Sequence, residues 1–103
     1  MSWAFTTFIW QWRGPAPFYF VTVPEDASAD IRAASKFVTY GWGMIPVTAT
    51  ARAADGTEVT WTTSMFVRDG LYALPIKAAP RQSLGLGEGD ELTVQLELRR
   101  SSR

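Results

Sequence analysis

The last regular segment of the chain alternates strictly between apolar and polar residues. Over residues 91–98 the apolar side chains are Leu92, Val94, Leu96 and Leu98. The residues between them are polar, namely Glu91, Thr93, Gln95 and Glu97. A period of two places all four apolar side chains on one face of a β-strand. We therefore predict a half-buried strand here, with Val94, Leu96 and Leu98 in the core.

Five earlier segments also have the character of strands. Residues 3–12 are rich in aromatic and β-branched side chains, which predicts a strand buried on much of both faces. Residues 18–23 follow a Gly/Pro turn and predict its hairpin partner. Residues 43–53 and 58–67 alternate on either side of Asp55-Gly56, a hairpin turn signal. Residues 71–76 form a fifth strand after the turn at Asp69-Gly70.

The inward faces of the two middle strands follow from their alternation. The predicted inward residues are Ile45, Val47, Ala49 and Ala51 on the first, and Val59, Trp61, Thr63, Met65 and Val67 on the second. Two prolines modify this pattern, because proline lacks the N–H that a strand interior uses. Pro46 indicates a strand edge or a bulge, and Pro75 indicates an interruption of the fifth strand.

Two short helices are expected between the strands. Pro24 ends the second strand, and a helix is predicted over residues 28–36 with Ser28 as its N-cap. Ile31 and Ala34 are expected to face the core. A second helix is predicted over residues 80–84, with proline at its first position and Gly85 in the left-handed conformation after its end.

The order strand, proline, helix, strand occurs twice, which predicts a pseudo-symmetric barrel closed by the two helices. The fold class is therefore mainly β, a small closed or nearly closed barrel of about six main strands. We expect a single domain over residues 1–103, with a core at about 3–98. Residues 99–103, which contain Arg99, Arg100 and Arg103, are interpreted as a solvated C-terminal tail.

Composition excludes several chemistries. The chain of 103 residues contains neither cysteine nor histidine, so disulfides, thiol catalysis and imidazole general bases are absent. Ten basic residues balance ten acidic ones, which argues against nucleic-acid binding driven by net charge. No apolar run approaches the ~20 residues of a membrane helix, and the first residues lack the basic region of a signal peptide. We expect a cytoplasmic protein with no cofactor, no bound metal and no membrane partner, as a monomer with a dimer as the alternative.

An ordered set of short segments resembles a known family. The segments are 20–24 (FVTVP), 42–47 (WGMIPV), 61–66 (WTTSMF) and 72–77 (YALPIK), followed by Arg81 and Gly89-Asp90. Together they resemble a bacterial family of small domains of unknown function with a double-split β-barrel fold, in some cases fused to a bacteriocin-protection-type domain. The resemblance covers about residues 5–98. It implies the fold and supplies no mechanism, because the family has no established activity.

The second half of the chain is more distantly similar to the half-barrels of AbrB/MazE-type transition regulators, which are swapped dimers that bind DNA. The similarity runs from Leu74-Pro75 through Arg81 to Gly89-Asp90. The chain departs from these regulators because it carries both halves of a barrel and has no net positive charge. Pro80 also departs from their pattern, which implies a second helix shorter by a turn.

Lys77 and Arg81 are the polar candidates for a binding site, because four residues separate them and they can present two cations on one helix face. One interpretation is an anion site. The other is an ion pair that closes the barrel, with Arg81 gripping Asp90. We predict the ion pair for Arg81 and assign ligand contact to Lys77.

Among the five tryptophans, Trp10, Trp12 and Trp61 are the candidates to line a cleft, with burial in the core as the alternative. Ser64 has no Gly-x-Ser-x-Gly context and no histidine to activate it. The glycines at 85, 87 and 89 precede a strand rather than a helix, so we interpret them as a structural turn and not a phosphate loop.

These observations favour a non-enzymatic module that binds a small molecule or a protein partner. A DNA-binding regulator of the transition-regulator type is the alternative, and an enzyme comes third.

Overall fold

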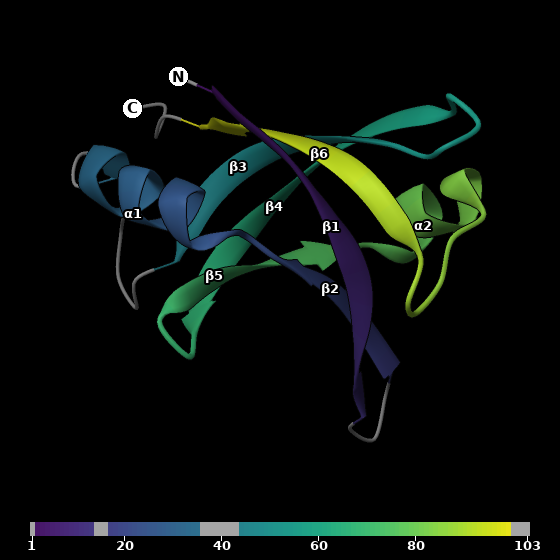
Figure 1. Cartoon of the computed structure of the whole chain (residues 1–103), viewed down its shortest axis with the longest axis horizontal. Coiled ribbons are helices and arrows are strands. Elements are labelled where there is room, and N and C mark those ends of the chain that lie inside the picture. Colours follow the sequence, from purple (N-terminus) through teal and green to yellow (C-terminus); the bar gives the residue numbers. More distant parts are fainter. Residues whose placement is uncertain (1, 14–16, 36–43, 100–103) are drawn as a thin grey trace.

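The computed structural model describes residues 2–13, 17–35 and 44–99, and these residues form a closed six-stranded barrel with two helices (Figure 1). The strands are β1 (Ser2–Arg13), β2 (Pro17–Thr22), β3 (Ile45–Arg52), β4 (Glu58–Arg68), β5 (Leu71–Ile76) and β6 (Glu91–Leu98). The helices are α1 (Glu25–Ala34) and α2 (Ala78–Leu84). Around the barrel the order is β1-β2-β5-β4-β3-β6, and all neighbours are antiparallel. The predicted mainly-β barrel is confirmed.

Two strands, β1 and β4, pass from one sheet of the barrel to the other. β1 pairs with β6 up to Phe8 and with β2 from Ile9 onward. β4 likewise pairs with β3 up to Met65 and with β5 from Phe66 onward. The units β1-β2-α1-β3 and β4-β5-α2-β6 thus follow the same path, as the repeated strand–proline–helix–strand order predicts.

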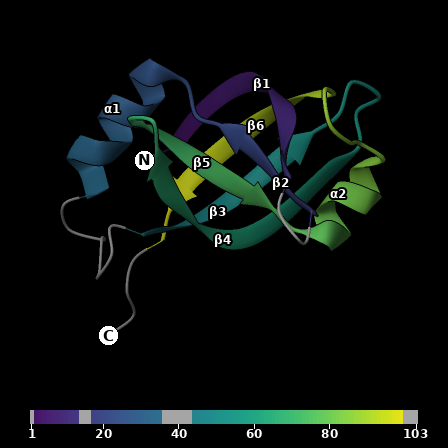
Figure 2. The same ribbon diagram turned by 90° about the horizontal axis from the view of Figure 1, so that it is seen from below.

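The two helices lie at opposite ends of the barrel in both views (Figures 1 and 2). The predicted start of the first helix was wrong, because α1 begins at Glu25 directly after Pro24. Ser28 is therefore the fourth helical residue and not the N-cap. It is 2% exposed, and its hydroxyl donates to the Val23 carbonyl (3.0 Å) and accepts from the Tyr72 N–H (3.2 Å). Carboxylates at the start of α1 suit the positive end of the helix without a side-chain cap.

The rest of α1 agrees in part with its prediction. Ile31 is fully buried, while Ala34 is half-buried. Residue 36, where the helix was predicted to end, lies outside the described residues.

The second helix, α2, begins at Ala78, two residues earlier than predicted. Pro80 is its third residue, a position whose N–H has no partner within a helix and where proline is tolerated. Gly85 follows the helix with φ of 70°, in the left-handed conformation as predicted. Its N–H donates to the carbonyls of Arg81 (3.0 Å) and Gln82 (3.1 Å).

Neither strand proline has the predicted effect. Pro46 marks no edge, because β3 pairs on both sides, and the β3–β4 register runs through it without a bulge. It lies one residue before the pairing with β6 begins at Val47, where a missing N–H costs no ladder bond. Pro75 does not interrupt β5 but pairs opposite Phe20, beyond the β4–β5 pairing, which covers residues 71–73.

The core fills the barrel interior with the inward faces of all six strands. Its members include Ile9, Val21, Ile45, Val47, Ala49, Ala51, Trp61, Met65, Leu74, Leu92, Val94 and Leu96. The alternation therefore predicted the inward sets of β3 and β6 almost completely. Leu98 is only half-buried, because it is the last residue of β6.

Two predictions of burial were wrong. Val67 is 50% exposed, because β4 there approaches the hairpin turn beyond the core. β1 is not buried on both faces, since Phe8 is 60% exposed on its outer face. The barrel wall is one sheet thick, so the outer face of a strand is covered only where a helix or a neighbouring side chain packs on it.

The hairpin turns predicted at Asp55-Gly56 and Asp69-Gly70 are present, while residues 14–16 of the first predicted turn lie outside the described residues. Gly56 has φ of 91°, and the Asp55 carboxylate accepts a hydrogen bond from the Thr57 N–H (2.9 Å), which lowers the pKa of Asp55. At the other turn Asp69 and Gly70 have φ of 53° and 81°, the positive values that tight hairpin turns require. Within the described residues, no helix is long and apolar enough to span a bilayer.

Candidate functional site

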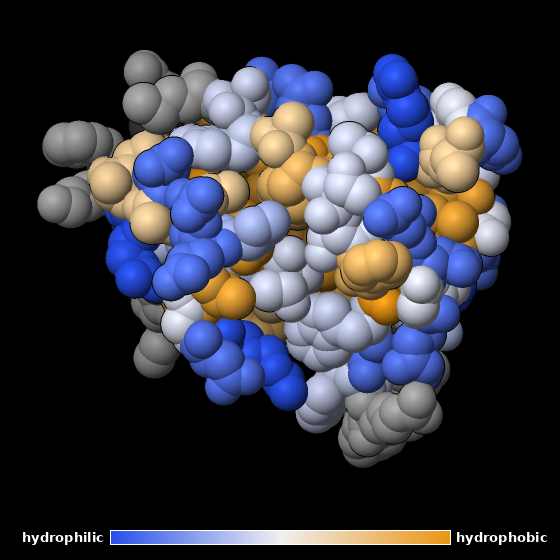
Figure 3. Space-filling model, viewed as in Figure 1, coloured by the Kyte–Doolittle hydropathy of each residue, from blue (hydrophilic) through white to orange (hydrophobic). Residues whose placement is uncertain are grey.

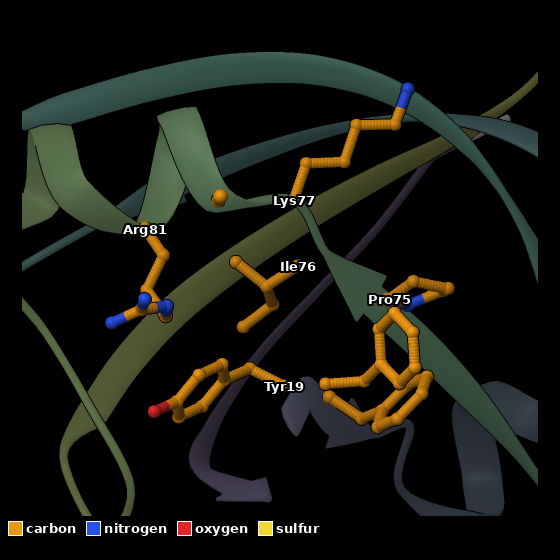
Figure 4. A pocket seen from close by; sticks show the side chains of 8 residues that line it. Tyr19, Pro75, Ile76, Lys77 and Arg81 are labelled. Carbon is orange, nitrogen blue, oxygen red and sulfur yellow. The ribbon is translucent and has the colours of Figure 1, made fainter. Parts of the chain in front are cut away.

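A pocket of about 410 Å³ opens between β2, β5 and the start of α2 (Figure 4). Its lining is mainly apolar and aromatic: Phe18, Tyr19, Phe20, Pro75, Ile76, Lys77, Ala78 and Arg81. The two charged residues of this lining are both cations, and no carboxylate belongs to it. Concave, apolar pockets with a few polar groups are the usual form of small-ligand sites.

Arg81 lies over the floor of the pocket rather than in an ion pair. Its guanidinium carbon is 4.0 Å from the centre of the Tyr19 ring, and one terminal nitrogen (Nη1) donates to the Leu86 carbonyl at 3.2 Å. Its Nε is buried and has no hydrogen-bond partner in the part of the chain that is described. The guanidinium therefore keeps unused donor capacity, which a buried polar group rarely does.

The predicted ion pair between Arg81 and Asp90 was wrong. The Asp90 carboxylate instead accepts from the Gly87 N–H at 2.8 Å, inside the turn that leads into β6. Aspartate commonly bonds to backbone in such turns, and this local partner satisfies Asp90. The glycine-containing segment 85–89 is accordingly a turn, as predicted.

Lys77 is exposed and belongs to the pocket lining, but its side chain extends away from Arg81 and Tyr19 (Figure 4). The two cations therefore do not converge, which removes the paired-cation form of the anion-site hypothesis. Arg81 is the cation that lies over the aromatic floor, and the assignment of ligand contact to Lys77 rather than Arg81 receives no support from this arrangement.

The three tryptophans singled out from the sequence have different surroundings. Trp61 is buried, and its indole N–H donates to the Pro75 carbonyl at 3.1 Å. It therefore supports the back of the pocket without lining it. Trp10 and Trp12 lie on the outer face of the barrel, where Trp12 is 43% exposed.

Trp10 and Trp12 belong to a continuous aromatic surface. Trp12 stacks on Phe18 (ring centroids 6.0 Å apart) and Trp10 on Phe20 (4.8 Å), each pair being cross-strand neighbours of β1 and β2. Phe20 also meets Phe66 of β4 edge to face at 5.5 Å. We call these five residues the aromatic strip. Phe18 and Phe20 line the pocket as well, so the strip and the pocket are continuous.

The sequence alone did not reveal Tyr19, Phe18, Phe20 or Phe66 as site residues. A signal was present, because even-numbered aromatics recur in residues 8–20 on either side of a turn. The hairpin register that would align them depends on residues 14–16, and the turn signal there does not define a turn type.

A second, more polar pocket of about 340 Å³ lies at the far end of the strip. Its lining is Trp10, Thr22, Arg68, Asp69, Leu71, Tyr72 and Ala73. Arg68 places its guanidinium carbon 4.9 Å from the Trp10 ring centre and its Nε 3.8 Å from Asp69. The Trp10 indole N–H is already used, because it donates to the Thr22 hydroxyl at 2.9 Å.

On the face of the molecule toward the viewer in Figure 3, apolar residues are interrupted by hydrophilic ones. Among the described residues there is also no group of three or more acidic side chains placed to hold a metal ion.

Comparison with known proteins gives a family and no activity. No curated protein matches the chain. Residues 5–96 match the family described as "Domain of unknown function (DUF1905)". Because the match extends over both halves of the barrel, the chain belongs to the DUF1905 family of domains of unknown function.

Proposed function

We propose that this domain is a non-enzymatic binding module whose pocket takes a small ligand with a flat apolar body and a carboxylate or phosphate group. The observation that carries the proposal is Arg81, a guanidinium that stacks on Tyr19 in a pocket lining with no carboxylate. Arginine matches the geometry of carboxylate and phosphate oxygens, to which it donates two parallel hydrogen bonds. A flat apolar group would fit the pocket walls, which Phe18, Phe20 and Pro75 provide.

The composition of the lining supports a binding role. Its polar side chains are Tyr19, Lys77 and Arg81, and it contains no carboxylate that could act with them as a general base. We also propose that the module acts as a monomer, which the closure of the barrel within one chain supports. A cytoplasmic setting remains our proposal for its location.

The proposal is tested by calorimetry and tryptophan fluorescence with phenyl phosphate and benzoate, and with benzyl alcohol as the uncharged match. We expect saturable binding of the two anions, weaker binding of the alcohol, and loss of the difference in Arg81→Met. Methionine keeps apolar volume over Tyr19 and removes the charge. Arg52→Met is the matched control, because Arg52 is exposed on β3 and pairs with Glu58.

Two outcomes would contradict this function. One is the absence of saturable binding of either anion by the unsubstituted domain, when that domain still unfolds cooperatively on heating. The other is anion binding that Arg81→Met leaves unchanged, which would place the anion elsewhere.

A further inference from the structure

The aromatic strip extends beyond what a small ligand in the pocket can cover. Trp12 lines no described pocket and is 43% exposed, and its neighbour Phe18 is 51% exposed. The rings of the Trp12–Phe18 and Trp10–Phe20 pairs are tilted by only 25° and 27°. Two flat, nearly parallel pairs therefore stand side by side on the outer face of the β1–β2 hairpin. The Trp10 ring already contacts Phe20 and Arg68, so the exposed Trp12–Phe18 pair is the part of the strip that can stack on a flat group of a ligand.

Cations flank the strip at both ends. Arg68 contacts Trp10 at one end, while Arg81 and Lys77 lie at the pocket end. The lining of the two pockets along the strip contains these three cations and one carboxylate, Asp69.

The remaining carboxylates belong to other parts of the barrel. They lie on α1, on the β3–β4 hairpin, and on β6 with the loop before it: Glu25, Asp26, Asp30, Asp55, Glu58, Glu88, Asp90, Glu91 and Glu97. The net charge of zero thus hides a local excess of positive charge beside the aromatic rings. A ligand that is both flat and negatively charged along its length would match this distribution.

We propose that the aromatic strip binds single-stranded nucleic acid, with a base stacked on the exposed Trp12–Phe18 pair and phosphates beside Arg68, Lys77 and Arg81. Aromatic platforms combined with cations are the general means of binding single strands without reading their sequence. A duplex fits less well, because its bases are stacked on one another inside the helix. A proline-rich peptide also fits less well, since it offers no charge to the cations and the Trp10 indole N–H is already bonded to Thr22.

This inference goes beyond the small-ligand function and does not depend on it. The strip residue that separates the two is Trp12, because it does not line the pocket. The residue that tests specificity within β1 is Phe8, an aromatic that is 60% exposed, pairs opposite Glu91 of β6 and is not part of the strip.

The test is fluorescence anisotropy of a labelled oligothymidylate titrated with the intact domain at low salt. We expect Trp12→Ala to weaken binding by about 5- to 150-fold, the range that follows from loss of one base-stacking contact. Phe8→Ala should leave binding unchanged. With two or three phosphates neutralised, the logarithm of the association constant should fall with the logarithm of salt at a slope of about −1.4 to −2.1.

Each remaining outcome is decisive. Absence of binding at low salt, equal losses in Trp12→Ala and Phe8→Ala, or binding that salt does not affect would overturn the proposal. Binding of a polyproline peptide that requires Trp12, with none of the oligonucleotide, would assign the strip to a protein partner. Phenyl phosphate binding should be unchanged in Trp12→Ala. The small-ligand function of the pocket can therefore be measured even if the oligonucleotide does not bind.

Discussion

At the scale of single residues, Ser28 connects three parts of the fold. Its buried hydroxyl bonds to Val23 at the end of β2 and to Tyr72 in β5, while its backbone belongs to α1. The sequence suggested a cap, because serine commonly begins helices. Whether Ser28 caps the helix or links α1 to the strands depends on β5, which supplies Tyr72, 44 residues further along the chain. Local sequence cannot supply that information.

Ser28→Ala should lower the free energy of unfolding by about 1–3 kcal/mol, because it leaves a buried carbonyl and a buried N–H without this partner. Urea denaturation followed by circular dichroism measures the change. Ser83→Ala, an exposed serine in α2, is the control and should stay within about 0.5 kcal/mol. Equal effects of the two substitutions would contradict the bridging role of Ser28.

Leu96→Ala should be costlier, at about 2–5 kcal/mol, because Leu96 is fully buried in β6 and its truncation leaves a cavity. Its neighbour Glu97 is exposed on the outer face, so Glu97→Ala should change stability by less than about 0.5 kcal/mol. The same denaturation experiment compares them. A loss below 0.5 kcal/mol for Leu96→Ala, far under the cavity range, would mean that the inward face of β6 is wrongly assigned.

At the scale of elements, strands were predicted well and their exceptions poorly. The alternation in β3 and β6 gave their buried faces because burial on one side of a sheet has the same period as the side chains. The two prolines misled the prediction because their effect depends on where pairing with the neighbour stops. The β3–β6 pairing begins at Val47, and the β4–β5 pairing ends at Ala73. The residues around each proline do not show where the pairing with the neighbouring strand stops.

The aromatic strip was also predicted only in part from the sequence. The sequence identified Trp10 and Trp12 as candidates, but their partners Phe18 and Phe20 come from register, and Phe66 comes from the crossing of β4 into the second sheet. Arg81 was predicted to matter, yet its contact with Tyr19 replaced the expected ion pair. The residue types therefore indicated some members of the site. The full set of residues that form it depends on strand register and on contacts between strands far apart in the sequence.

Gly85→Ala should destabilise the domain by about 1–2 kcal/mol, the cost of a left-handed conformation for a residue with a Cβ. Space is not the reason, since an added Cβ at Gly85 would meet no atom within 4 Å. Gly87 has equal space and no positive φ, so Gly87→Ala should lack this penalty. Thermal unfolding of the pair isolates the backbone contribution, and equal melting temperatures would contradict it.

At the scale of the whole molecule, zero net charge describes the chain but not its surface. The two pockets along the aromatic strip are lined by three cations and one carboxylate, while the other carboxylates lie on α1, on the β3–β4 hairpin, and on β6 with the loop before it. Long-range attraction to a polyanion depends on the total charge, whereas contacts at short range depend on the local one, because salt screens charges beyond about 8–10 Å.

We therefore expect no sequence-specific binding to duplex DNA at physiological salt. Anisotropy titration with labelled duplexes of varied sequence is the measurement, and the single-stranded form of each serves as its comparison. Sub-micromolar binding to one duplex, weakened by salt, would instead favour a regulator of the transition-regulator type.

The pairing of β1 with β6 has a consequence for folding during synthesis. These strands pair from Ser2 opposite Glu97 to Phe8 opposite Glu91, so the wall closes between the first and last strands of the barrel. At 5–20 residues per second of synthesis, β6 emerges roughly 5–20 s after β1. Throughout that interval β2 is the only one of the two neighbours of β1 that has been synthesised. The backbone groups of β1 that later pair with β6 therefore have no strand partner. A ribosome-bound chain would therefore carry an aromatic hairpin with an unpaired strand edge, the kind of surface that chaperones shield from neighbouring chains.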